Sequence, residues 1–514
     1  MPGLLQLLNR PVVAILAVGL LAGGLRMWNL ASPADRIFDE VYYPKAGCIL
    51  VGGTDDQCDV DSSEERYWRE HDWDVGSWTH PPLGKWMIGL GEKAFGYDAF
   101  GWRIASALAG TLTVMAVALL AYLLFGSVLW ASVAGLLMSV EGLSFVLSRT
   151  GLLDSFVGMW VTFGLLFLVL DRRWIDRRTD PAPEAPEDRA ELAPPIDPET
   201  DEPATGPDDP PPPRRVPSPI WRPWRFATGL AMGAAIATKW SGALALAAAG
   251  LLTLMWETVR RRRSGDELLP AFGWTIARES IGIVLAFLIV PAAVYVLVYL
   301  PWFHHFGWSV EEWRVLHVRM WDYHRTLEWF RPGADGGAAT PSHPWLSHAW
   351  TWLPLRRPVL FFARYPDDSV RWITTIGNPA IFWGAFWTLP YTAYAWWRRR
   401  DWRAGFIVVA FAVQFFPWFP VSRPQFLFYM MPMVPLLVLA AVLTARDFSD
   451  MRIEQRDPRT GEVAGRSRLH PYRPFVWGYV AAAVALFVFF YPVLTGTQIS
   501  RTAWQLRVWM PSWS

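Results

Sequence analysis

Long uninterrupted apolar runs dominate the pattern of hydrophobic and polar positions along this chain. Two examples are PVVAILAVGLLAGGL, which begins at Pro11, and IGIVLAFLIVPAAVYVLVYL, which begins at Ile281. A helix needs about twenty mostly apolar residues to cross a bilayer, and several runs approach or reach that length. A large soluble core would rarely require so many of them. The pattern therefore predicts an all-α integral membrane protein.

We predict about eleven transmembrane helices from these runs. Their approximate bounds are 11–30, 102–125, 129–147, 153–171, 225–238, 241–257, 277–301, 375–397, 403–419, 424–445 and 475–495. Residues 176–218 are rich in Pro, Glu and Asp and lack the apolar content for a core. We therefore expect a disordered cytoplasmic linker there.

Clusters of arginine beside the apolar runs indicate the orientation, because short cytoplasmic loops carry the excess of Lys and Arg. The clusters are DRRWIDRR from Asp171, RRRR at 260–263, RRRDWR at 398–403 and the basic segment 446–473. Eleven spans with a cytoplasmic N-terminus place all four inside. Merging the two spans that meet at Lys239 would move the later clusters outside, so the charge pattern supports their division.

This topology divides the chain into five parts. They are an N-terminal transmembrane part (1–175) with an outer loop at 31–101, the linker (176–218), central transmembrane helices (219–302), an extracytoplasmic loop (303–374) and C-terminal transmembrane helices (375–514). The short segments 148–152 and 416–424, the TKWSG turn and the C-terminus are also expected outside.

Composition agrees with burial in a bilayer, since 53% of the 514 residues are hydrophobic and 18% are charged. The 33 tryptophans fit belts at the level of the lipid headgroups. The net charge is +1 and the basic residues form no stripe, which gives no reason to expect nucleic-acid binding. No small-residue cleavage pattern precedes Arg26, so the first run is predicted to be a retained span rather than a signal peptide.

The chain has two cysteines, Cys48 and Cys58, which lie ten residues apart in the first outer loop. Outside the cytoplasm two thiols can pair, and we predict a disulfide that closes a small loop. Without a nearby set of Cys and His residues, the pair gives little reason to expect zinc.

Charged and polar residues gather where the predicted outer loops meet the membrane. Asp39 and Glu40 follow the first span, in RIFDEVYYPKAG. The others at this depth are His80 and Lys85 in THPPLGK, Arg103 in FGWRIAS, Arg149 and Asp154 in SRTGLLDS, Lys239 in TKWSG, and Arg423 and Gln425 in VSRPQFLFY. A single acid at an interface would merely be solvated, but charges at the membrane edge are costly unless they pair or face water. Several together predict a hydrophilic site that opens outward.

Mixed charges at such a site suit one class of reaction. A carboxylate removes a proton from a hydroxyl nucleophile while cations stabilise a departing phosphate. The phosphate would belong to a lipid carrier, because nucleotide sugars are not normally available on the outer face. Two points stay open. His80, before two prolines, either aims its imidazole or belongs to a structural turn. Arg103 and Asp154 either serve the site or pair to hold spans together.

We predict that no metal ion or other cofactor is required, since Lys and Arg can hold a single phosphate. Asp39, Glu40 and Asp154 would suit a divalent ion only if they converge. The outer loop near residues 301–374 contains six more candidate ligands: His304, His305, His317, His324, His343 and His348. Their scattered spacing favours surface positions over metal ligands.

The sequence resembles the protein O-mannosyltransferase family, which are membrane glycosyltransferases of the GT-C fold. The likeness lies in FDEVYYPKAG, HPPLGK, FGWRIAS, RTGLLDS, TKWSG and SRPQFLFYMMP, which follow in order from about residue 36 to 435. Each motif alone is weak, whereas the acid pair together with HPPLGK and LLDS is specific.

This resemblance implies an enzyme that moves mannose from a polyprenyl-phosphate carrier to Ser or Thr hydroxyls, with inversion at the anomeric carbon. Asp39 matches the catalytic acid of the family, and its neighbour Glu40 is expected to position the acceptor or the base. Lys239 and Arg423 match positions that we assign to the carrier phosphate. The expected partners are membrane lipids, the polyprenyl-phosphate mannose donor, translocating acceptor polypeptides and the secretion translocon, at the plasma membrane with an extracytoplasmic active site.

Departures from the family pattern also matter. Eukaryotic members contain a MIR domain between later spans, and the outer loop at 301–374 is too short for one. The chain therefore resembles a bacterial member, and its Arg, Ala and Trp content resembles actinobacterial proteins. Two other functions are considered, a GT-C transferase that acts on a lipid or glycan and a transporter or flippase. No internal repeat is seen and the charges lie mostly at one face, which disfavours transport.

Overall fold

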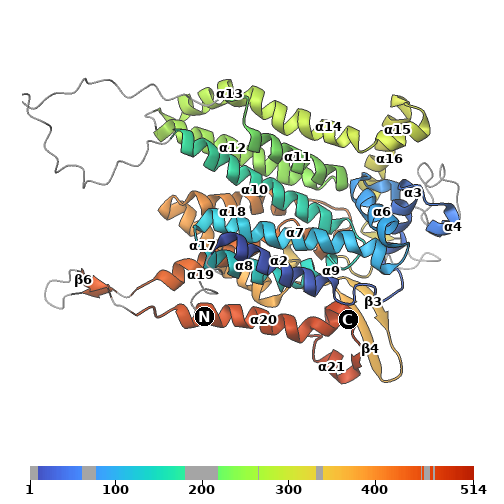
Figure 1. Ribbon diagram of the computed structural model, residues 1–514. Helices are drawn as coiled ribbons and strands as arrows, with labels where there is room; N and C mark the ends of the chain where they lie inside the picture. Colours follow the sequence, from blue (N-terminus) through green and yellow to red (C-terminus); the bar gives the residue numbers. More distant parts are fainter. Residues whose placement is uncertain are drawn as a thin grey trace, which may run out of the picture.

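The computed structural model describes residues 10–60, 77–179, 218–263, 266–331, 340–452, 454–456, 463–466 and 469–514. Its long helices lie alongside one another in one bundle (Figure 1). They are α2 (Pro11–Met27), α7 (Ala99–Phe125), α8 (Val128–Ser139), α10 (Asp154–Thr179), α11 (Pro223–Thr238), α12 (Gly242–Arg263), α13 (Leu268–Val284), α14 (Val290–Leu297), α17 (Pro379–Arg399), α18 (Trp402–Phe415), α19 (Val434–Asp450) and α20 (Arg473–Thr495). Short helices and a small sheet cover one end, which we call the capped end.

Several described helices are long and apolar enough to cross a membrane. They are Ala99–Phe125, Asp154–Thr179, Gly242–Arg262, Leu268–Leu297 and Arg473–Thr495. Shorter apolar helices lie at Pro11–Met27, Val128–Ser139 and Trp402–Trp418. The chain is thus a multi-pass helical membrane protein, and the count of eleven spans stays a prediction. The predicted linker at 176–218 begins inside α10, which continues to Thr179, and residues 180–217 of it lie outside the described residues.

Two predicted spans differ from the helices. The run 129–147 is divided into α8 and α9 (Gly142–Leu147). Glu141 lies between them, and its carboxylate accepts hydrogen bonds from two backbone N–H groups in the first turn of α9, which ends the continuous helix. In the run 424–445, residues 424–433 form a loop with a 3-10 turn, and α19 begins only after it. Hydropathy indicates burial rather than helix formation. Both connections are mostly buried and therefore apolar, so in the sequence they resemble transmembrane spans.

The capped end contains short elements. The helices are α3 (Tyr43–Leu50), α4 (Asp55–Cys58), α6 (Leu83–Phe95), α15 (Leu300–Phe306), α16 (Val310–Thr326) and α21 (Arg501–Gln505). The antiparallel sheet has the order β3 (Leu360–Arg364), β4 (Ser369–Thr374) and β7 (Ile499–Ser500). A further strand pair is β1 (Phe330–Arg331) with β2 (Thr340–Pro341), whereas β5 (Glu454–Arg456) and β6 (Val463–Arg466) pair at the opposite end of the bundle (Figure 1). The fold is therefore mainly rather than entirely helical. The sequence did not predict these strands, because strands this short leave no clear alternation of apolar and polar residues.

Close backbone contact joins α3, which follows the acid pair, to α6, which follows the HPP turn. A Cβ atom on Gly89 would lie 2.1 Å from the carbonyl oxygen of Gly47, so larger residues would separate the two helices. The predicted disulfide between Cys48 and Cys58 is confirmed, and it ties α3 to α4. These contacts bring two motifs that are distant in the sequence to one place.

Helices α10 and α11 pack antiparallel, and an ion pair joins them near each end. Asp171 of α10 meets Arg222, just before α11, at 3.1 and 2.5 Å. Asp154, the first residue of α10, meets Lys239, just after α11, at 3.0 Å. The two acids are seventeen residues apart, and so are the two bases, which corresponds to about 25 Å of helix. This matched spacing fixes the register and places Asp154 and Lys239 at the capped end.

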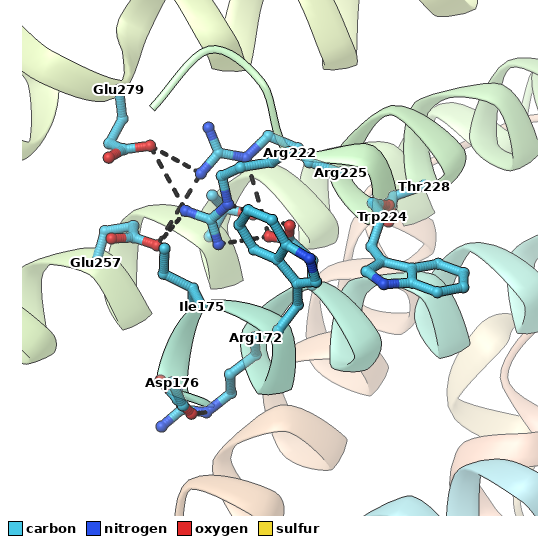
Figure 2. Close-up of polar contacts among 12 residues, drawn as sticks. Arg172, Ile175, Asp176, Arg222, Trp224, Arg225, Thr228, Glu257 and Glu279 are labelled. Atoms are coloured by element: carbon cyan, nitrogen blue, oxygen red, sulfur yellow. Dashed lines mark hydrogen bonds and ion pairs between the residues drawn. The ribbon is translucent and has the colours of Figure 1, made fainter. Parts of the chain in front are cut away.

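Figure 2 shows Arg222 and Arg225 within a cluster of charged side chains. The cluster lies at the end of the bundle opposite the capped end, since Asp171 is near the end of α10 and Arg222 precedes α11. Arg222 also contacts Glu257 of α12 at 2.5 Å, and Arg225 contacts Glu279 of α13 at 2.8 Å. All four side chains are buried. Acids and bases from different helices compensate one another, which allows charges to remain inside the bundle.

Replacing Arg222 with Lys is expected to lower the free energy of unfolding by about 1–3 kcal/mol. A single ammonium cannot form the planar fork that reaches both Asp171 and Glu257. Chemical unfolding of the purified protein in detergent would measure the change. The control is Arg314→Lys, since Arg314 pairs with Glu311 on the surface and an exposed pair contributes about 0–1 kcal/mol. Equal losses in the two variants would contradict a special contribution from the cluster.

Candidate active site

The Glu40 carboxylate is buried and fully occupied by hydrogen bonds. Arg103 donates to it through Nε and Nη2, each at 2.7 Å. The backbone N–H groups of Ile37 and Gly151 donate at 3.0 and 2.7 Å. A carboxylate with four donors and no exposed surface holds its loop in place rather than meeting a substrate. These contacts favour a role for Glu40 in holding the loop.

Two arginines hold the loop between α2 and the acid pair. Arg103 also donates to the carbonyl oxygens of Leu30, Pro33 and Asp35 at 3.2, 2.6 and 2.9 Å. Arg103 pairs with Glu40 and Asp154 pairs with Lys239, so Arg103 and Asp154 do not pair with each other. The contacts of Arg103 favour a role in loop structure over phosphate binding.

Arg149 serves the end of α2 in the same way. It donates to the carbonyl oxygens of Arg26 and Trp28, each at 2.7 Å, and of Asn29 at 3.1 Å. The last carbonyls of a helix have no intrahelical partner, so a cation with several donors stabilises them. Arg149, like Arg103, is thus directed at backbone rather than at the open part of the site.

Asp39 lies beside Glu40 in the 3-10 turn η1 (Phe38–Val41). Unlike the carboxylate of Glu40, its carboxylate is not occupied by hydrogen bonds within the described residues. Phe38 has a φ of +51°, in the left-handed region, and its ring stacks on Phe361 of β3 with centroids 4.4 Å apart. The Asp39 side chain is partly exposed, and within the described part of the chain it accepts no hydrogen bond. A strained residue held by packing next to an unoccupied carboxylate is a common feature of functional sites.

The pKa of Asp39 is raised to about 7, mainly because the surrounding protein removes water from the carboxylate; Lys239 opposes this shift and Asp154 adds to it. A carboxylate with a pKa near neutrality can hold and release a proton at physiological pH, which is the property a general base requires. Of the two adjacent acids, Asp39 is thus the one that is available for proton transfer.

Lys239 and Arg423 both lie close to Tyr429. The ammonium of Lys239 is 4.8 Å from the Tyr429 ring centre, in addition to its pair with Asp154. Arg423 donates from Nη2 to the Tyr429 hydroxyl at 3.0 Å. Among the residues that the structure describes, Arg423 makes no ion pair with a carboxylate. It therefore retains a positive charge that could receive an anion.

His80 lies in the turn that precedes α6, and Lys85 lies in the first turn of that helix. Lys85 is buried, and its ammonium donates to the His80 carbonyl oxygen at 2.6 Å. Burial and the nearby cations Lys239, Lys85 and Arg423, together with His324, lower the pKa of His80 well below its ordinary value. The imidazole is neutral and lies 5.2 Å from the His324 ring, between centroids. The two interpretations of His80, an aimed imidazole or a structural turn, both stay predictions.

Gln425 holds the loop that contains Arg423. Its side-chain amide donates to the carbonyl oxygens of Trp418 and Val421 at 2.9 and 2.7 Å. Its backbone carbonyl accepts from Ser347. Gln425 is buried, and these contacts favour support of the loop rather than contact with a ligand.

Models of protein families match most of the chain. The C-terminal four TMM region of protein-O-mannosyltransferase matches residues 309–513, and dolichyl-phosphate-mannose-protein mannosyltransferase matches 79–177 and 217–307. A polyprenol-phosphate-mannose–protein mannosyltransferase of Mycolicibacterium smegmatis is 32% identical, over 96% of this chain and 91% of its own. The chain belongs to the protein O-mannosyltransferase family. The resemblance read from the sequence is confirmed.

Other members and neighbours agree with this assignment. A polyprenol-phosphate-mannose–protein mannosyltransferase of Mycobacterium tuberculosis is also 32% identical, over 96% of this chain and 90% of its own. The Saccharomyces cerevisiae Pmt1–Pmt2 complex bound to the sugar donor matches with a TM-score of 0.69 at 13% identity, covering 100% of this chain and 94% of its own. Apo ArnT from Cupriavidus metallidurans matches at 0.52 and 17% identity, covering 94% and 76%. These neighbours support the GT-C fold.

Four of the loop histidines, His317, His324, His343 and His348, are partly exposed and contact neighbouring side chains. His317 bonds to the Tyr295 hydroxyl at 2.9 Å, and His324 bonds to Arg423 at 2.8 Å. His343 and His348 are partly buried against aromatic rings. His304 is exposed, and the side chain of His305 lies outside the described residues.

Metal ligands do not converge in the described part of this protein O-mannosyltransferase, where no group of three or more His, Cys, Asp or Glu side chains is arranged to hold an ion. Glu40 is turned to Arg103 and Asp154 to Lys239, so the three acids considered from the sequence form no common ligand set. The expectation that the reaction needs no metal stays a prediction.

Sequence reasoning missed Tyr429 and considered His324 only as a metal ligand or a surface residue. Tyr429 lies inside the SRPQFLFYMMP motif, so an aromatic residue next to a candidate phosphate arginine was a usable signal. For His324 the sequence offered none, because its partners Arg423 and Thr79 are distant in the chain.

Proposed function

We propose that this enzyme transfers mannose from a polyprenyl-phosphate carrier to Ser or Thr hydroxyls of proteins, with inversion at the anomeric carbon. The observation that supports it most directly is that an open carboxylate and two cations lie close together at the capped end. One open carboxylate with a pKa near 7, Asp39, lies within electrostatic reach of Lys239, and Lys239 and Arg423 both lie near the Tyr429 ring. The relatives named above support the identity of the donor.

The proposed reaction is a single displacement. The acceptor hydroxyl oxygen attacks the anomeric carbon, and its proton passes to the Asp39 carboxylate. The bond between the anomeric carbon and the phosphate oxygen breaks, and its electron pair leaves with the polyprenyl phosphate. Lys239 and Arg423 stabilise the negative charge that develops on this oxygen. One displacement with one base forms no covalent intermediate, and this is the reason for inversion.

The remaining assignments divide the predicted residues by role. Asp154 orients Lys239 through their ion pair, and His80 borders the same region as a neutral ring. Lys85, Arg103, Arg149, Glu40 and Gln425 are proposed to hold the loops that present these groups. The hydrogen bonds described above for these side chains go to backbone groups or to one another, which supports this division.

The proposal also includes location and partners. Eleven spans with a cytoplasmic N-terminus in the plasma membrane would direct the capped end to the extracytoplasmic side, where extended polypeptides leave the translocon. Arginine clusters lie at the ends of α10 and α12 that are far from the capped end, which supports this orientation. Contact with the secretion machinery stays a prediction.

An acceptor panel tests the function. Purified enzyme in detergent receives polyprenyl-phosphate [³H]mannose with a Ser/Thr peptide, a glycolipid or an oligosaccharide in separate reactions. We expect label in the peptide and no label when its Ser and Thr residues are replaced by Ala. Label only in the lipid or glycan would instead favour the alternative GT-C activity. Turnover in detergent would also exclude pure transport, because no compartments exist there.

A further inference from the structure

His324 is on the last turn of α16, where it connects two separate loops of the capped end. Its Nε2 atom lies 3.0 Å from the carbonyl oxygen of Thr79, next to the HPP turn. Its Nδ1 atom lies 2.8 Å from Nη1 of Arg423. The ring also lies near Trp240, with centroids 5.7 Å apart. A residue from the outer loop thus contacts both sides of the proposed phosphate region.

The two partners determine where the proton of His324 resides. A carbonyl oxygen only accepts, so Nε2 must donate its N–H to Thr79. A guanidinium only donates and stays protonated, so Nδ1 must accept from Arg423. Burial and the adjacent Arg423 charge lower the pKa of His324 to about 4. The imidazole is therefore neutral, in one tautomer, and both ring nitrogens are used.

The choice of a neutral acceptor matters for the charge of Arg423. Its guanidinium is held by the imidazole of His324 on one side and the hydroxyl of Tyr429 on the other. Neither partner is an anion, and the Nε atom is buried without a hydrogen-bond partner among the described residues. A carboxylate in place of His324 would fix the same geometry but would neutralise the charge. The arrangement orients Arg423 while keeping its full charge for an incoming anion.

We propose that His324 is a positioning residue for the donor, which fixes the Arg423 guanidinium through a neutral acceptor so that its charge faces the phosphate of the lipid carrier. This inference rests on the proposed function for the identity of the anion. A purely structural alternative exists, in which His324 only anchors α16 to the turn at Thr79. The two roles use different ring nitrogens, so they can be separated.

Two conservative variants separate them. The Asn side chain can present its oxygen near the position of Nδ1, so His324→Asn keeps an acceptor for Arg423 and loses the donor to Thr79. The Gln side chain can present its amide nitrogen near the position of Nε2, so His324→Gln keeps the donor and loses the acceptor. We expect His324→Gln to raise the KM for polyprenyl-phosphate mannose roughly ten- to hundredfold, with little change in kcat or in the KM for peptide. His324→Asn should stay within about threefold of the original enzyme.

His317→Asn provides a matched control, since His317 is on the same helix but bonds to Tyr295 and to the Trp313 backbone. It should leave the KM for the donor unchanged. Arg423→Gln should raise that KM at least as much as His324→Gln. A normal KM for the donor in His324→Gln, together with a raised KM in His324→Asn, would overturn the inference and assign His324 to anchoring. Unchanged donor KM in both variants would overturn it as well.

A binding measurement keeps this result distinct from a failure of the proposed function. The thermal shift produced by undecaprenyl phosphate in detergent reports carrier-phosphate binding without mannose transfer. If the protein transfers no mannose but His324→Gln and Arg423→Gln both weaken this shift, the inference stands and the proposed function fails. Absence of any shift in the original protein, or an equal shift in all variants, would overturn the inference itself.

Discussion

Mannose transfer by Asp39→Asn is expected to fall by roughly 10²–10⁴-fold, the usual contribution of a general base. The amide has nearly the same shape but cannot accept the hydroxyl proton. Transfer from polyprenyl-phosphate [³H]mannose to a Ser/Thr peptide measures the loss. Because the Asp39 carboxylate accepts no hydrogen bond among the described residues, the substitution should cost little stability, and the thermal midpoint should stay near that of the original enzyme.

The matched control is Asp35→Asn in the same loop. Asp35 is exposed, and its carboxylate lies 3.6 Å from Arg364 on the surface. Such an exposed pair contributes little to stability. The activity of Asp35→Asn should therefore stay within about threefold of that of the original enzyme. Full activity in Asp39→Asn, or an equal loss in both variants, would remove Asp39 from the mechanism.

The pH dependence of transfer follows from the raised pKa of Asp39, about 7. The carboxyl is protonated below this value and cannot act as a base, so kcat/KM should rise as the pH increases through about 7 and then level off. The same shift affects stability in the opposite sense. The folded protein keeps a proton that the unfolded chain releases near pH 4, so burial of Asp39 lowers the free energy of unfolding as the pH rises from about 4 to about 7. A flat kcat/KM profile across this range would contradict the assignment.

Arg103→Met is expected to lower the free energy of unfolding by about 3–5 kcal/mol, because it leaves the buried Glu40 carboxylate without its cation. Hydrogen bonds from Arg103 to the carbonyls of the loop at residues 30–35 are lost as well. The loop also positions Asp39, so activity should fall together with stability. Chemical unfolding in detergent, followed by tryptophan fluorescence, measures the first effect.

A double variant distinguishes the buried pair from general damage. Adding Glu40→Gln to Arg103→Met removes the unpaired charge, so the combined loss of stability should be smaller than the sum of the two single losses. Arg364→Met serves as the control, since Arg364 is largely exposed in its pair with Asp35. Strict additivity at Arg103 and Glu40 would show that the pair is not coupled.

Much of the fold follows from the sequence because its physical basis is local. Apolar runs of sufficient length predict transmembrane helices, and the disulfide between Cys48 and Cys58 follows from two close cysteines in an outer loop. The errors occur where a chain segment is buried without being helical. The loop at 424–433 is as apolar as a span, and only its contacts with neighbouring helices distinguish it from one.

The sequence by itself determined which residue types meet at one end of the bundle, since motif order and membrane topology bring Asp39, Lys239 and Arg423 to the same depth. Only the tertiary structure decided their roles. Arg103 and Arg423 are the same residue type in similar predicted positions, yet the first is paired with Glu40 and the second with the neutral His324. The partner of a charged side chain depends on which distant segment packs beside it, and that partner decides whether its charge is neutralised or stays available for a substrate.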